Sequence, residues 1–277
     1  MAMDLKEFAK RSRALHSTVK LLRTLPRGGA SALTDLSRTT DIVRVLPNTM
    51  LGLPALATLY ECARTLERDA IPGDFAECGV WAGGAVGLMA LVNRRYGRHA
   101  RTLHLFDSFE GLPAPTEQDV EVYAAYRSER RDLAGADASA TGQLVAIGAC
   151  ARPAYGGSTL ANVTHLLDRV LKLDPQHYVI HQGWFQETVP AASNTIGPLA
   201  LLRLDGDWYE SIRVCLEGLY ERLAPGGYLI IDDYGSFTGC TRAVDEFLHA
   251  RRVPADQLTI EPWGAYLRRP SLPGHSG

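Results

Sequence analysis

Four aspartates follow two short apolar runs in the C-terminal half of the sequence. One run, 199–204, is followed by Asp205 and Asp207, and a second run ends in Asp232 and Asp233. Like charges placed together repel one another unless a cation or a raised pKa relieves them. Carboxylates with no Cys or His beside them favour a hard cation, for which Mg²⁺ is the first choice. The alternative is that these acids only form turns at strand ends.

The residues between the two runs space their apolar side chains at helical intervals from Glu210 to Leu223, and Pro225-Gly226-Gly227 ends the pattern. A strand, a helix and a second strand in this order form a parallel, right-handed unit. If the two strands are neighbours, their carboxyl ends lie at one edge of the sheet, where open α/β sheets bind ligands. The sequence therefore predicts that the four aspartates converge at that edge.

A glycine-rich turn follows the strand predicted from Asp74 to Cys78. The turn begins at Glu77 and leads into a helix predicted from about Ala85 to Tyr96. Glycines let the backbone approach a ligand, and the N–H groups at a helix start can bind it. The spacing is not Gly-x-Gly-x-x-Gly, and a carboxylate would repel pyrophosphate, so a dinucleotide is not favoured. A cationic or amine-bearing ligand suits Glu77 better.

A further acid ends the next predicted strand, Thr102 to Phe106. Asp107 comes first, followed by Ser108 and Phe109. In folds of this kind, an acid after the second strand binds ribose hydroxyls. Acids at two successive strand ends, Glu77 and Asp107, therefore favour a bound nucleoside.

The composition is that of an ordinary globular protein. The 277 residues suit one larger α/β domain, or one domain with an appendage, and 46% are hydrophobic. The net charge of −2 gives no general attraction to nucleic acid or to an anionic membrane, and no apolar run is long enough to span a bilayer. Five scattered cysteines and a start without an apolar signal core predict a cytoplasmic protein with reduced thiols.

The chain is expected to divide into three parts. Residues 1–46 predict a helical appendage that closes over a site or contacts another subunit, with a membrane-surface role as the weaker alternative. Residues 47–270 form the main domain, with an insertion around 114–157 that is either helical or a mobile lid. Residues 271–277 are expected to fray. Other elements expected in the main domain are helices at 49–68, 158–171 (N-capped by Ser158) and 241–251, and strands at 177–181, 259–260 and 265–268.

Four segments together resemble the TylF-type (macrocin) O-methyltransferases. They are GDFAECGVW at 73–81, FDSFEGLP at 106–113, LRLDGDWYES at 202–211 and GGYLIIDDYG at 226–235. The resemblance extends from about Thr49 to Arg269. It implies a Rossmann-like class I methyltransferase fold, with a mostly parallel central sheet and helices on both faces. It also implies S-adenosylmethionine- and Mg²⁺-dependent methylation of a hydroxyl, often on a deoxysugar of a bacterial natural product.

The family pattern implies a role for each matching residue. The residues expected to bind S-adenosylmethionine are Thr49, Met50, Glu77, Cys78, Gly79, Val80, Trp81, Asp107, Ser108, Phe109, Gly183, Trp184 and Asp205. The expected magnesium ligands are Asp205, Asp232 and Asp233, and Asp207 is the expected general base. We expect Glu77 to reach the amino group of the cofactor, because pairing with the sulfonium would be lost in the transition state.

Departures from the family leave the acceptor open. Ala82 stands where the family usually has Arg, Gly206 replaces the Thr of Asp-Thr-Asp, and the connection 115–157 does not align. The expected partner is a glycosylated small molecule, and the expected assembly is a homodimer or higher homo-oligomer.

Two alternative functions are open. A phenol or catechol methyltransferase usually has Lys where Trp208 stands. A non-catalytic binding or scaffolding protein would not be expected to keep all six acids.

Overall fold

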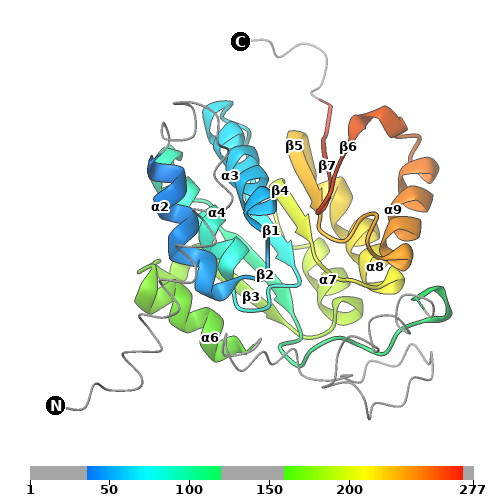
Figure 1. Ribbon diagram of the computed structural model, residues 1–277, viewed down its shortest axis with the longest axis horizontal. Coiled ribbons are helices and arrows are strands. Elements are labelled where there is room, and N and C mark those ends of the chain that lie inside the picture. Colours follow the sequence, from blue (N-terminus) through cyan, green and yellow to red (C-terminus); the bar gives the residue numbers. More distant parts are fainter. Residues whose placement is uncertain (1–35, 120–158, 271–277) are drawn as a thin grey trace.

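A computed structural model describes residues 36–119 and 159–270, which form one seven-stranded sheet with the order β3-β2-β1-β4-β5-β7-β6 (Figure 1). The strands are β1 (Asp74–Cys78), β2 (Leu103–Asp107), β3 (Tyr178–Gln182), β4 (Leu199–Leu204), β5 (Leu223–Ile231), β6 (Leu258–Glu261) and β7 (Gly264–Arg268). From β3 to β5 neighbouring strands run parallel, and β7 is antiparallel to both β5 and β6.

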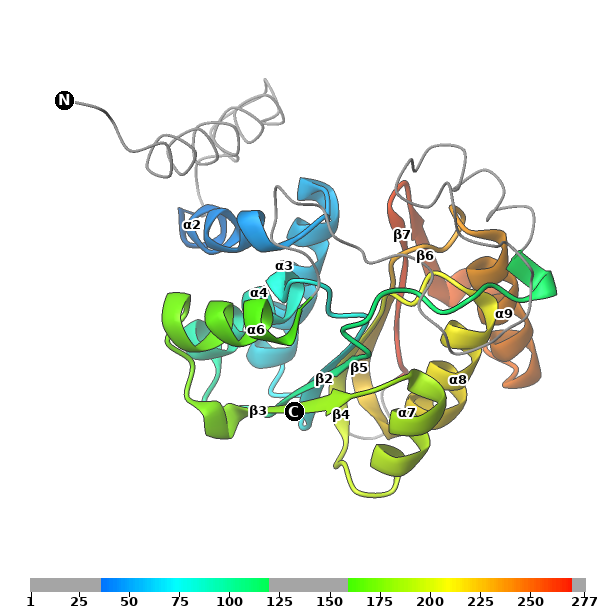
Figure 2. The ribbon, with the colours of Figure 1, turned by 90° about the horizontal axis from the view of Figure 1, so that it is seen from below.

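Helices cover both faces of this sheet (Figure 2). One face carries α2 (Leu36–Val45), α3 (Leu53–Arg68), α4 (Gly84–Tyr96) and α6 (Leu160–Thr164), which continues into a π-helical turn (His165–Val170). The other face carries α7 (Phe185–Ser193), α8 (Tyr209–Leu219) and α9 (Thr238–Ala250). A hydrophobic core lies on each face, so the predicted fold class is confirmed.

The central strands are apolar because helices bury both of their faces. All six residues of β4 are buried, and five of them are Leu or Ala. The exception is Arg203, which is 1% exposed. A buried guanidinium requires ionic partners, and these prove to be part of the site described below.

The predicted β4–α8–β5 unit is present, and its two strands are parallel neighbours. The structure differs in where the second strand begins, because β5 starts at Leu223 and includes Pro225-Gly226-Gly227. Gly226 adopts φ +83°, which lets the strand continue through an irregular step. The residues expected to separate the helix from the strand are therefore part of the strand.

Three other helix starts differ from the prediction, and one of them is α9, which begins at Thr238 rather than at residue 241. α3 begins at Leu53 rather than Thr49, with a proline in its first turn, so Thr49 and Met50 lie in an extended segment. The helix expected from Ser158 begins at Leu160, and the side chain of Thr159 caps it by accepting the Asn162 N–H. Ser158 itself lies outside the described residues.

The end of the predicted appendage packs into the main core. Ile42 and Val45 of α2 are buried in the core cluster on the α3–α4 face, and buried Asp41 pairs with Arg95 of α4 at 2.8 Å. Residues 1–35, most of the predicted insertion (120–157) and the predicted frayed tail lie outside the described residues. Within the ranges 36–119 and 159–270, no helix has the length and apolar character needed to cross a membrane.

Candidate active site

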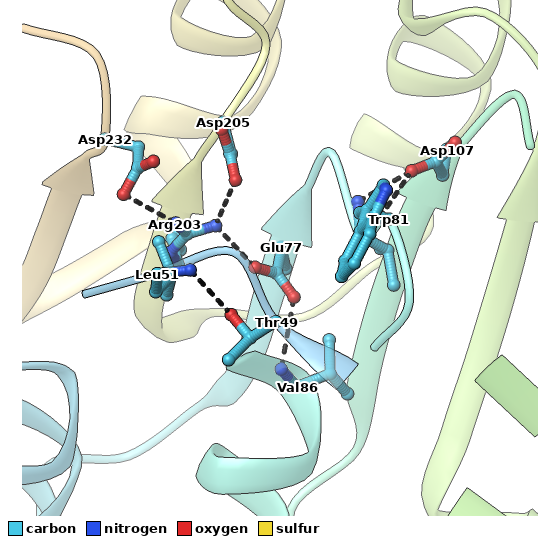
Figure 3. Close-up of polar contacts among 10 residues, drawn as sticks. Thr49, Leu51, Glu77, Trp81, Val86, Asp107, Arg203, Asp205 and Asp232 are labelled. Carbon is cyan, nitrogen blue, oxygen red and sulfur yellow. Dashed lines mark hydrogen bonds and ion pairs between the residues drawn. The ribbon is translucent and has the colours of Figure 1, made fainter. Parts of the chain in front are cut away.

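Three parallel strands bring their terminal acids to one edge of the sheet (Figure 3). The ladder continues past the strand ends: the Asp205 N–H donates to the Cys78 carbonyl at 2.8 Å, and the Asp232 N–H donates to the Leu204 carbonyl at 3.0 Å. These bonds fix the backbones of β1, β4 and β5 side by side. The convergence predicted from the sequence is therefore present.

Arg203 lies at the centre of these acids, as Figure 3 shows. Its Nη1 donates to Glu77 Oε1 at 2.6 Å and to Asp205 Oδ2 at 2.9 Å. Its Nη2 donates to Asp232 Oδ1 at 2.7 Å. Sequence reasoning missed this residue, although a single charge within a buried apolar strand is a signal that acids must surround it.

Glu77 does not have a free carboxylate in this structure. One oxygen pairs with Arg203, and the other accepts the Val86 N–H of α4 at 3.1 Å. Burial raises the pKa of Glu77 to about 8, and Arg203 opposes that shift. An amino group of the cofactor would have to share this carboxylate with the guanidinium.

A cluster of oxygen ligands lies beside Arg203. Asp205, Asp207 and Asp233 each offer a carboxylate oxygen, and these oxygens lie within 4.8 Å of one another. Oδ2 of Asp233 is buried and takes no hydrogen bond from the described residues. Burial raises the pKa of Asp233 well above its usual range, and the charges of Asp207 and Asp205 raise it further. The mutual repulsion of these carboxylates is the kind that a bound cation would relieve.

Asp232 lies at the same edge, but it is not one of the three residues whose carboxylate oxygens lie within 4.8 Å of one another, so the structure groups Asp207 rather than Asp232 with the predicted ligands Asp205 and Asp233. Burial, and then the nearby charge of Asp205, raise the pKa of Asp232 to about 7, against the opposing effect of Arg203. One of its oxygens is bonded to Arg203. A cation at this edge would therefore meet Asp232 through its other oxygen.

Asp107 organises the glycine-rich turn. Its Oδ2 accepts the Val80 N–H at 2.7 Å and the Trp81 N–H at 3.0 Å, and its Oδ1 accepts the Phe109 N–H at 2.7 Å. Burial raises the pKa of this carboxyl, and the three backbone bonds oppose that shift. The acid predicted to bind ribose also holds the turn after β1 to the end of β2.

Three predicted site residues have left-handed backbone conformations. Trp81, Phe109 and Asp207 have φ values of 49°, 57° and 56°. Such conformations are uncommon for residues other than glycine, and they concentrate at functional sites where the surrounding structure enforces them. They support the assignment of these turns to a site.

Two cavities adjoin at this edge. One, of about 220 Å³, lies beside Asp107 and Ser108, and the other, of about 200 Å³, lies beside Glu77 and the aspartates. The residues that line both are Met50, Trp81, Asp205 and Asp207. Predicted residues that line only the first are Gly79, Ser108, Asp107, Gly183 and Trp184. Predicted residues that line only the second are Thr49, Glu77, Val80, Asp232 and Asp233.

Two predicted residues line neither cavity. The Cys78 side chain is buried in the core on the α8 face of the sheet, and Phe109 packs against the core on the α4 face.

Other residues near the cavities were not predicted to be site residues. Trp208 is 1% exposed, and its Nε1 donates to the Pro113 carbonyl at 3.1 Å. Wall residues that the sequence did not single out include Leu112, Phe185, Ser211 and Trp263. Leu112, Phe185 and Trp263 gave no signal because core residues have the same apolar or aromatic character, and Ser211 gave none because a lone serine is common at a helix start.

Comparison with known proteins identifies a family and several relatives that this chain resembles. The family model described as Macrocin-O-methyltransferase (TylF) matches residues 22–135 and 160–269. A Streptomyces olivaceus protein, 8-demethyl-8-(2,3-dimethoxy-alpha-L-rhamnosyl)-tetracenomycin-C 4'-O-methyltransferase, is 37% identical over 229 residues, which are 83% of this chain and 78% of that protein. Mycinamicin III 3''-O-methyltransferase of Micromonospora griseorubida is 33% identical, over 80% of this chain and 78% of that protein.

The solved structure of the O-methyltransferase NovP is similar in fold and sequence. It is 31% identical, has a TM-score of 0.65, and the match covers 80% of this chain and 82% of NovP. The fold and the acid-lined edge thus define an S-adenosylmethionine-dependent O-methyltransferase with a Rossmann-like sheet. Within that class, the chain belongs to the macrocin O-methyltransferase (TylF) family.

Proposed function

We propose that this enzyme methylates a sugar hydroxyl of a glycosylated natural product, with Mg²⁺ bound at the aspartate cluster. The observation that carries the proposal is the pair of adjoining cavities that share Asp205 and Asp207. One cavity offers a nucleoside site and the other an acid-lined acceptor site. The relatives named for a rhamnosyl-tetracenomycin and for mycinamicin III support the choice of acceptor class.

The first cavity is the proposed cofactor site. Asp107 lies at its wall for the ribose hydroxyls, with Ser108 and the Gly183-Trp184 turn beside it. Glu77, at the wall of the second cavity, would meet the amino group of the cofactor near the cavity junction. Bound there, S-adenosylmethionine supplies an activated methyl group on a positively charged sulfur.

The second cavity is the proposed acceptor and metal site. Its acids fit a hard divalent cation because they are all oxygen ligands, outnumber the one guanidinium that bonds to them, and leave the buried Oδ2 of Asp233 without a hydrogen bond from described residues. Asp205, Asp232 and Asp233 would hold Mg²⁺. The ion supplies Lewis acidity, which lowers the pKa of an adjacent hydroxyl.

Asp207 is the proposed general base. It lines both cavities, and a left-handed backbone presents it beside Asp205 and Asp233. From that position its carboxylate would accept the acceptor hydroxyl proton as the oxygen attacks the methyl group. The remaining acceleration would come from holding two reactants in neighbouring cavities.

The test is methyl transfer from labelled S-adenosylmethionine to a rhamnosylated aromatic natural product and to its aglycone, each with Mg²⁺ or with excess chelator. We expect methylation of the glycoside only, and only with the metal. Methylation of the aglycone on a phenol would instead favour the phenol methyltransferase alternative. Full activity in chelator would remove the metal from the proposal.

A further inference from the structure

The bonds of Arg203 use one oxygen from each of two proposed metal ligands. Asp205 uses Oδ2 and Asp232 uses Oδ1, at 2.9 and 2.7 Å. The second oxygen of each accepts no hydrogen bond from the described residues. A hydrogen bond to one oxygen restricts the rotation of the carboxylate and so limits the directions that its other oxygen can take.

We propose that Arg203 is a positioning residue that holds Asp205 in the orientation in which it joins Asp207 and Asp233 as a metal ligand, and that holds Asp232 beside them; this inference rests on the proposed function. The guanidinium is planar and presents several N–H donors in a rigid fork, so one group can hold several carboxylates in fixed directions. Groups that orient metal ligands commonly control metal affinity without touching the metal.

Glu77 completes the positioning system. It shares Nη1 of Arg203 with Asp205, and its second oxygen is bonded to the start of α4. The guanidinium is therefore held from three strands, β1, β4 and β5, and cannot turn to favour one acid alone. Lysine, a point charge on a flexible stem, lacks the fork needed to reproduce all three bonds.

A purely structural role for Arg203 makes a different prediction. If Arg203 only neutralised buried acids, Arg203→Lys would keep most of the charge balance, and any loss would appear in the stability of the fold. If Arg203 orients the ligands, the folded lysine variant would bind metal more weakly. Metal affinity of the folded protein therefore separates the two roles.

The experiment is a titration of the full chain with Mn²⁺ followed by electron paramagnetic resonance, which detects free Mn²⁺ without any turnover. We expect Arg203→Lys to weaken Mn²⁺ binding about 10- to 100-fold relative to the wild type. The matched control is Arg213→Lys on the surface of α8, where Arg213 pairs with Glu210 and Glu217. It should bind Mn²⁺ as the wild type does. Circular dichroism establishes that each variant is folded.

An unchanged Mn²⁺ affinity in folded Arg203→Lys would overturn the inference and leave the proposed metal site intact. A wild type that binds no Mn²⁺ would overturn the metal site itself. If Arg203→Lys does not fold, the double variant Arg203→Met with Glu77→Gln removes the cation together with one of its acids. The same weakening is expected there, and wild-type affinity in that variant would equally overturn the inference.

Discussion

Gly79 lies directly against the main chain of Asp205, so that a Cβ atom on residue 79 would overlap the Asp205 carbonyl oxygen. Gly79 also adopts φ +90°, a region that favours glycine. The glycine-rich turn after β1 and the acidic edge after β4 are thus in contact through their backbones. A side chain at residue 79 would separate the two halves of the site.

We therefore expect Gly79→Ala to lower the free energy of unfolding by more than about 2 kcal/mol and to weaken S-adenosylhomocysteine binding. Gly197→Ala is the control, because a Cβ atom there meets no atom within 4 Å. Urea denaturation and calorimetry measure the two effects. Equal stability and affinity in the two variants would show that the close approach has no consequence.

Replacing Asp233 by Asn tests the metal cluster. The change removes one charge and one anionic ligand while preserving the shape of the side chain, so metal-dependent turnover should fall by about 100-fold or more. Binding of S-adenosylhomocysteine in chelator should stay as in the wild type, since Asp233 does not line the proposed cofactor cavity. Asp256→Asn, at an exposed position, is the control. Turnover that is equal in both variants would exclude Asp233 as a ligand.

A buried ion pair far from the cavities provides a stability test. Arg101 and Glu67 are 1% and 3% exposed, and Nε of Arg101 lies 2.7 Å from Oε1 of Glu67. Arg101→Met leaves Glu67 buried without its cation and should cost about 3–5 kcal/mol of unfolding free energy. Exposed Arg213→Met should cost about 1 kcal/mol or less. Chemical denaturation compares the variants, and equal losses would contradict this account.

The acid sensitivity of the fold should depend on His181. Its ring stacks on Phe106 with centroids 4.1 Å apart, and its Nε2 lies 3.1 Å from Nδ1 of His104. Burial, and then the neighbouring His104, lower the pKa of His181 to about 4. The unfolded value is about 6.5, so between pH 6.5 and pH 4 the unfolded chain binds the extra proton. Stability is therefore present above pH 6.5 and is lost as the pH falls toward 4.

His181→Gln removes that proton uptake. From pH 7 to pH 5 the variant should lose about 1–2 kcal/mol less unfolding free energy than the wild type, after allowance for the partial exposure of the ring. Urea denaturation at the two pH values measures the difference. Parallel losses in both proteins would mean that His181 titrates as it does in the unfolded chain.

Strand ends were predictable because acids followed apolar runs. Asp107 is the last residue of β2, Asp205 and Asp232 directly follow β4 and β5, and parallel topology then brings neighbouring ends together. Element starts were less predictable where local signals compete. The apolar spacing that favours a helix from Thr49 continues through Gly52, but Pro54 belongs in the first turn, so the helix begins at Leu53.

The charge balance of the site could not be derived from strand ends alone. Arg203 lies inside β4, two residues before Asp205, and its side chain meets acids from two other strands. Only the sheet order shows that Glu77 and Asp232 flank it. From the sequence, the aspartates formed a cluster with no positive side chain beside them. In the structure, the guanidinium of Arg203 in β4 pairs with Asp205 and Asp232.

The shared wall of the two cavities sets a rule for redesigning the acceptor range of this enzyme. Met50 and Trp81 line both cavities. A substitution at either residue that enlarges the proposed acceptor cavity would therefore also change the wall of the proposed cofactor cavity. Gly52, Ala55 and Trp263 line the acid-side cavity alone. Libraries built at those three positions would reshape the cavity that Glu77 also lines, while leaving the wall around Asp107 and Ser108 unchanged.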